Sequence, residues 1–244
     1  MTDYGELSEK LRSRDPVTRD KIAYSALMAL IPNLEPPQRR RLGDEMAERL
    51  KDPETQARTF APLILDGLVD AGEFDPSWLA AFEDWYPSEQ DLRGYDEELG
   101  WLHAVAHGAD LLGTLGFRCT DVAPERMLAL AVKRLLAKTD YVLRDQEDDR
   151  LAYAMALTLT REELTEQTAT AWLEPVAADF ESGEPGPVPA HATNTMRTLR
   201  LLYILVDRGV RPNWGRGETL RVRHRDAVKQ RLAEVLALVA PFTG

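Results

Sequence analysis

Two histidines and an aspartate near the middle of the chain are the residues whose types and spacing best suit chemistry. His103, His107 and Asp110 are four and three positions apart, so on a helix they share one face. Two imidazoles at that spacing can share one zinc or manganese ion, and Asp110 can serve as a third ligand or orient His107. The glutamate of the zinc-protease pattern is absent, because Ala104 occupies its position.

On a helix over residues 97–117, these side chains would form a polar stripe, and the opposite face of the helix would be apolar. The stripe contains His103, His107, Asp110 and Thr114, and it carries no Lys, Arg or Glu. The expected apolar face contains Trp101, Val105, Gly108, Leu112 and Leu115. Three interpretations stay open: a buried hydrogen-bond network, the wall of a groove that binds a partner or small ligand, or a metal or acid–base site.

A second polar pair follows the Pro- and Gly-rich stretch 182–189. His191 and Asn194 are three positions apart near the start of an expected helix, and we take them as candidate ligand- or partner-binding residues beside the stripe. Capping of that helix is the simpler interpretation. The side chains of suitable type that could complete a metal shell are His191, Glu147, Asp148 and Asp149.

The elements that must position these residues are helices. Asp-Pro pairs at 15–16, 52–53 and 75–76 and Pro124 are typical helix starts, and no series of period-two runs indicates a sheet. The first helix should bury Ile22, Ala26, Ala29 and Leu30, and the second Leu42, Met46 and Leu50. Trp78, Phe82, Trp85 and Tyr86 form an aromatic stripe typical of a core.

About ten helices with short connections predict an all-α fold of stacked antiparallel hairpins. We expect an irregular, HEAT-like α-solenoid, with a compact helical bundle as the alternative. Residues 1–244 should form a single domain, with one weak candidate boundary at 182–189.

Composition limits the classes of partner. The net charge of −11 argues against nucleic-acid binding and favours a basic or neutral partner. No apolar run is long enough to span a bilayer, no signal-peptide pattern begins the chain, and the single cysteine, Cys119, suits a reducing compartment. These features predict a cytoplasmic protein without membrane contacts, and the excess of Arg over Lys suggests a GC-rich bacterial source.

The C-terminal part is basic against this trend. Seven basic side chains have only Glu218 and Asp226 as local acids; they are Arg211, Arg216, Arg221, Arg223, Arg225, Lys229 and Arg231. Pairing with the acidic remainder of the chain is the favoured interpretation, and contact with an anion or phosphate is the alternative.

The stretch Gly100 to Leu112, GWLHAVAHGADLL, resembles the signature of a bacterial family, domain of unknown function 2785. Residues 147–152 and 194–203 resemble weaker parts of the same pattern. The resemblance implies an all-helical protein of similar length and makes the histidine motif a family feature. It implies no reaction.

Two functional hypotheses follow. The first is a helical-repeat scaffold that binds a protein or small-molecule partner in a polar groove around His103, His107 and Asp110. The alternative is a metal-dependent or acid–base enzyme of hydrolase type that uses the same side chains.

Overall fold

The computed structural model describes residues 4–184 and 186–242, except for the side chain of Trp214. Pro185, in the predicted boundary loop, lies outside the described residues. Helices dominate this part of the chain, and its only strands form one antiparallel hairpin of two residues each. The all-α prediction is therefore confirmed. In the same part of the chain, no helix has the length and apolar character needed to cross a membrane.

The residues group into two compact units. The first contains residues 1–114 and 143–147, and the second contains residues 115–142 and 148–244. Two of the division points fall within helices, the third falls between residues 142 and 143 outside any helix, and the stretch 182–189 lies inside the second unit. The single domain and the HEAT-like arrangement stay predictions, and each unit is described by itself.

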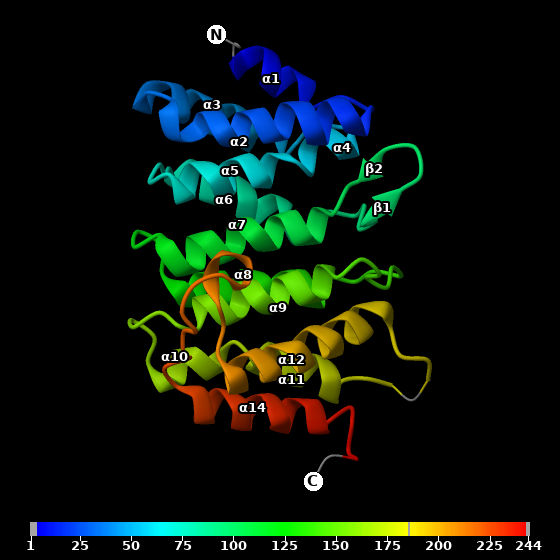
Figure 1. The fold of residues 1–244 in the computed structure, drawn as a ribbon. Coiled ribbons are helices and arrows are strands. Elements are labelled where there is room, and N and C mark those ends of the chain that lie inside the picture. Colours follow the sequence, from blue (N-terminus) through cyan, green and yellow to red (C-terminus); the bar gives the residue numbers. More distant parts are fainter. Residues whose placement is uncertain (1–3, 185, 243–244) are drawn as a thin grey trace. The chain divides into compact units, whose positions relative to one another are not determined.

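The first unit consists mainly of helices that succeed one another in chain order (Figure 1). Its elements are α1 (Tyr4–Lys10), π-helix η1 (Val17–Tyr24), α2 (Ser25–Leu30), 3₁₀-helix η2 (Ile31–Asn33), α3 (Pro36–Arg49), α4 (Thr55–Arg58), α5 (Ala61–Asp70), α6 (Pro76–Trp85), β1 (Tyr95–Asp96), β2 (Gly100–Trp101) and α7 (Ala104–Arg118) up to Thr114. Helix α3 packs against both α5 and α6, and α2 packs against α1 and α5.

The core of this unit comes from the expected stripes on α3 and α6. Leu42, Met46 and Leu50 are at most 2% exposed, and the four aromatic residues of the stripe from Trp78 to Tyr86 are also buried. The side chain of Asp75 caps α6 by accepting the backbone N–H of Ser77. The helical spacing and the Asp-Pro start were therefore sufficient to predict these two elements.

The first predicted helix buries a different face from the expected one. Ile22 is 48% exposed, whereas Ala23, Leu27 and Ile31 are almost fully buried. The physical reason is η1, which is π-helical over 17–24 and therefore contains more residues per turn than an α-helix. The wider turn rotates the buried face, so a 3.6-residue wheel assigned the wrong side chains.

The second unit is also helical (Figure 1). Its elements are the last turn of α7, α8 (Pro124–Leu136), α9 (Glu147–Thr158) from Asp148, α10 (Glu166–Ala171), α11 (Glu174–Glu181), α12 (Ala190–Arg208), α13 (Pro212–Gly215) and α14 (Arg225–Ala237). Helix α12 packs against α8 and α14, and α14 also packs against α10 and α11.

Candidate functional site

The histidine motif begins on a hairpin, not inside a helix. The expected helix over 97–117 starts only at Ala104, because the chain first forms β1 and β2, which pair Tyr95 with Trp101. The carbonyl of Gly94 accepts the backbone N–H groups of Leu102 and His103. His103 itself has a positive φ of 47° and ends the hairpin immediately before α7.

Arg19 holds this hairpin from inside the first unit. Its side chain is fully buried, and Nη2 donates to the carbonyl oxygens of Leu99 at 2.6 Å and Trp101 at 3.2 Å. Gly100, at φ 72°, allows this approach, since a Cβ there would lie 2.8 Å from Pro16. A buried guanidinium thus replaces the sheet partner that a two-stranded hairpin lacks.

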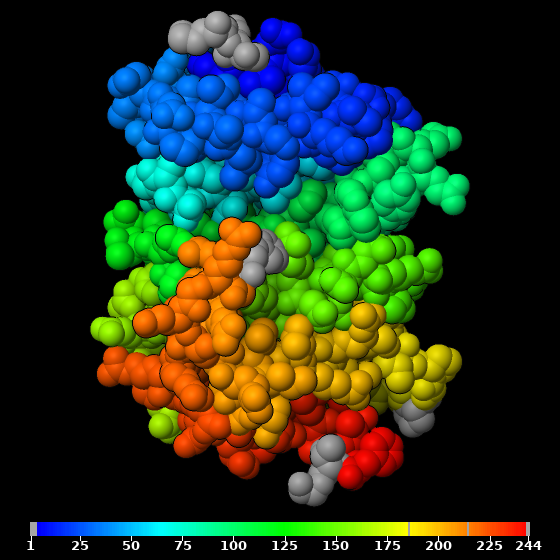
Figure 2. All heavy atoms as spheres, viewed as in Figure 1, coloured from blue at the N-terminus to red at the C-terminus, as the bar shows by residue number. Residues whose placement is uncertain are grey.

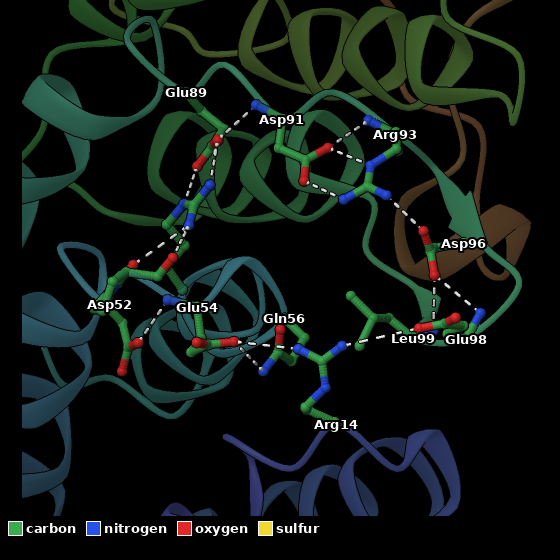
Figure 3. Close-up of polar contacts among 12 residues, drawn as sticks. Arg14, Asp52, Glu54, Gln56, Glu89, Asp91, Arg93, Asp96, Glu98 and Leu99 are labelled. Carbon is green, nitrogen blue, oxygen red and sulfur yellow. Dashed lines mark hydrogen bonds and ion pairs between the residues drawn. The ribbon is translucent and has the colours of Figure 1, made fainter.

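A network of charges fixes the outer part of the same loop (Figure 3). Arg93 binds both carboxylate oxygens of Asp91 and also reaches Asp96. Asp96 in turn accepts the backbone N–H groups of Glu98 and Leu99 at 2.9 Å each. Because these bonds satisfy the backbone of a short turn, the hairpin presents its side chains in a fixed geometry.

Two exposed aromatic side chains stand on this hairpin. Tyr95 is 51% exposed and Trp101 is 46% exposed, and their rings meet edge to face at 4.9 Å. Trp101 also stacks on the imidazole of His103, with ring centroids 4.5 Å apart and planes within 9° of parallel. The expected placement of Trp101 on a buried helix face is therefore wrong, because the residue precedes the helix.

His103 faces a buried carboxylate. Its Nδ1 lies 3.4 Å from Oε1 of Glu147, whose side chain is fully buried and whose Oε2 accepts the backbone N–H of Asp145. Burial alone would raise the pKa of Glu147, but the imidazole of His103 and backbone N–H groups outweigh burial and lower that pKa. Glu147 was a candidate partner by chemical type only, and the structure places it against His103.

His107 is a core residue. It is 7% exposed, its Nδ1 lies 2.9 Å from the carbonyl oxygen of Thr59, and Phe60 packs edge-on against its ring at 5.0 Å. A carbonyl can only accept, so this bond requires a proton on Nδ1. The ring centroids of His103 and His107 are 5.7 Å apart, so the two imidazoles are neighbours.

The remaining predicted site residues lie on α7 and in the second unit. Asp110 and Thr114 are half-buried further along α7. His191 and Asn194 belong to the second unit, where Nε2 of His191 lies 3.2 Å from Asp179 and 2.9 Å from Nζ of Lys138, and Asn194 donates to the carbonyl of Tyr141. As binding residues, these four stay predictions.

The described residues contain no group of three or more His, Cys, Asp or Glu side chains placed to hold a metal ion. His107 already directs Nδ1 at a protein carbonyl. As ligands of a zinc or manganese ion, His103, His107 and Asp110 stay a prediction.

Sequence reasoning missed Tyr95, Trp101 and Arg19 as members of the site. The glycines at 94 and 100 were the available signal, because paired glycines around a short polar stretch favour a hairpin. A Cβ on Gly94 would overlap the Glu147 carboxylate, so this glycine also permits the approach of the loop to Glu147.

A family model for a protein of unknown function, DUF2785, matches residues 42–204. This match covers most of the chain, including the hairpin, both histidines of the motif and Glu147. The chain belongs to this family. No curated protein and no solved structure matched it.

Proposed function

We propose that this DUF2785 protein is a binding scaffold whose hairpin holds a basic segment of a partner against Tyr95 and Trp101. The observation that carries the proposal is the exposed, edge-to-face pair of Tyr95 and Trp101 on the hairpin, in which Trp101 is also stacked on His103. Solvent-exposed aromatic faces bind Lys and Arg side chains by cation–π attraction, and Trp is the best of them. Large exposed aromatic side chains are also enriched where proteins meet partners.

The charge around the pair supports a cationic ligand. Residues 94–98 contain the three acids Asp96, Glu97 and Glu98 and no basic residue, in a chain of net charge −11. Glu97 is exposed between the two strands, and it has no ion-pair partner among the described residues. An acidic rim with an aromatic centre attracts a positive side chain and repels an anionic one.

Trp101→Ala should weaken binding of a basic peptide about tenfold or more, because it removes the face over which the cation lies. The probe is an Arg- and Lys-rich hexapeptide titrated into ¹⁵N-labelled protein, with the backbone amide resonances of the hairpin as readout, since Trp101→Ala has no indole at this position. Glu97→Gln should weaken binding by a smaller factor, and a Glu-rich hexapeptide should leave these resonances unmoved.

Phe242→Ala is the matched control, because it removes an aromatic side chain that is 90% exposed in the second unit. Equal affinities for the wild type and Trp101→Ala, or equal binding of the basic and acidic peptides, would contradict the proposal.

A second candidate function rests on the contact between His103 and Glu147. Nδ1 lies 3.4 Å from Oε1 of this buried carboxylate, whose pKa is lowered, and Nε2 has no hydrogen-bond partner among the described residues. An imidazole oriented by a carboxylate in this way can accept a proton from water through Nε2, while the water oxygen attacks an ester carbonyl.

Hydrolysis of p-nitrophenyl acetate tests this candidate. If His103 is a general base, His103→Gln should lower the rate about a hundredfold, and Glu147→Gln should lower it and shift the pH profile. His224→Gln, which changes a histidine of the second unit, should leave the rate unchanged. A wild-type rate no faster than that of free imidazole at equal concentration rules the candidate out.

A further inference from the structure

The loop between α12 and α14 is a closed and well-anchored element. Val210 and Leu220 exchange both backbone hydrogen bonds, at 3.0 and 2.7 Å, which brings the two ends of the loop together. Gly209 ends α12 at φ 87°, where a Cβ would lie 2.5 Å from Thr219. The hydroxyl of Tyr153 on α9 donates to the carbonyl of Arg211 at 2.9 Å. The loop therefore has a defined shape within the second unit, and it lies on the surface, in orange in Figure 2.

A pocket of about 470 Å³ opens beside this loop. Its apolar wall consists of Tyr153 and Leu205, since Val210 at the same pocket is 0% exposed. The rest of the lining includes Arg208, Arg211 and Thr219, and Nε of Arg211 donates to the Thr219 hydroxyl at 3.2 Å. The pocket thus pairs a hydrophobic surface with two guanidinium groups, the combination that binds an anion with an organic part.

The charges of the C-terminal part divide into two groups. Arg225 and Lys229 pair with Asp207, and Arg231 pairs with Glu174 and Glu234, so the interpretation as intramolecular pairs holds for α14. Within the described residues, Arg208 and Arg211 have no acidic partner. Residues 208–221 contain four arginines and Glu218 as their single acid, so this loop carries a net charge of +3 in an acidic chain.

We propose that this pocket binds a phosphate monoester, with the phosphate on Arg208 and Arg211 and the organic group against Tyr153 and Leu205. Guanidinium groups match phosphate oxygens in geometry and charge, and the hydroxyl of Thr219 adds a donor. The site is independent of the hairpin, and seven of its eight lining residues lie beyond the segment that the family model matches. The pocket therefore lies almost entirely outside the segment that the family model describes.

Calorimetric titration with phenyl phosphate and with inorganic phosphate tests the proposal. Phenyl phosphate should bind saturably and more tightly than inorganic phosphate, because only the former has a group for the apolar wall. Arg208→Ala and Arg211→Ala should each weaken phenyl phosphate binding about tenfold or more. Affinity should also fall as salt is added.

The matched control is Arg200→Ala, which removes the same charge from an exposed position on α12 outside the pocket, and it should leave the affinity unchanged. Arg208 has no hydrogen bond to other described residues, so its variant should fold, and circular dichroism checks this. Absence of saturable binding up to about 10 mM, equal affinities for the two phosphates, or wild-type affinity in both arginine variants would each overturn the proposal.

Discussion

Arg58→Ala should lower the free energy of unfolding by about 3–5 kcal/mol, because it leaves the carboxylate of Glu89 buried without its counter-charge. Glu89 is 5% exposed, and Arg58 binds both of its carboxylate oxygens, at 2.6 and 2.9 Å. The indole of Trp85 and the backbone N–H of Asp91 donate to the same carboxylate, which therefore cannot move towards solvent without breaking these bonds. Figure 3 shows Glu89 beside Asp91. Urea denaturation measures the loss.

Two further variants test whether the loss of stability in Arg58→Ala comes from the buried charge of Glu89. Arg93→Ala removes an exposed arginine from the neighbouring network and should cost about 1 kcal/mol or less. Adding Glu89→Gln to Arg58→Ala removes the buried charge and should recover part of the loss. A loss of similar size for Arg58→Ala and Arg93→Ala would mean that charge burial is not the reason.

The pH dependence of the free energy of unfolding provides a second test of this explanation. Burial alone would raise the pKa of Glu89, but Arg58 and the N–H of Asp91 outweigh it and hold that pKa below its usual value. This contribution to stability is present above the ordinary glutamate pKa of about 4.3 and is lost as the pH falls below it. In Arg58→Ala the arginine no longer opposes burial, so the pKa of Glu89 is higher than in the wild type. The difference in the free energy of unfolding between the variant and the wild type should therefore narrow from neutral pH to about pH 4.

Arg19→Ala should cost a similar 3–5 kcal/mol and should also release the hairpin. The substitution leaves the carbonyls of Leu99 and Trp101 without a donor and removes the guanidinium that lies 4.7 Å from the ring centre of Phe60. We therefore expect two results: a lower urea midpoint, and a Trp101 indole resonance with narrower lines and random-coil shift.

Lys21→Ala is the control, because Lys21 is an exposed cation on the same segment, and its loss should change stability by about 0.5 kcal/mol or less. If Arg19→Ala lowers stability while the Trp101 resonance keeps its native shift, Arg19 stabilises the core but does not hold the hairpin.

The parts of the fold that depend on local signals were predictable from the sequence. Asp75 caps α6, and Leu42, Met46 and Leu50 line the buried face of α3, because capping and amphipathic spacing involve neighbours in the chain. Ile22 was misassigned because nothing local in the sequence marked the π-helical segment.

The candidate site was only half predictable for a related reason. His103 and His107 were identified by type and spacing, but their environments depend on Thr59, Arg19 and Glu147, which are distant in the chain. Strands of two residues are also too short to show a period of two, so the hairpin that exposes Trp101 had no pattern of its own.

The position of Arg19 affects where the family segment can be cut. The matched range begins at residue 42 and ends at 204, so excision along these limits would discard Arg19 and sever α12 before its last turn. Such a fragment would keep the histidine motif but lose the side chain that holds its hairpin, and it would expose the α5 surface that α2 covers. A recombinant fragment intended to retain the hairpin should therefore start upstream of η1, since sequence similarity and the folding unit have different limits in this protein.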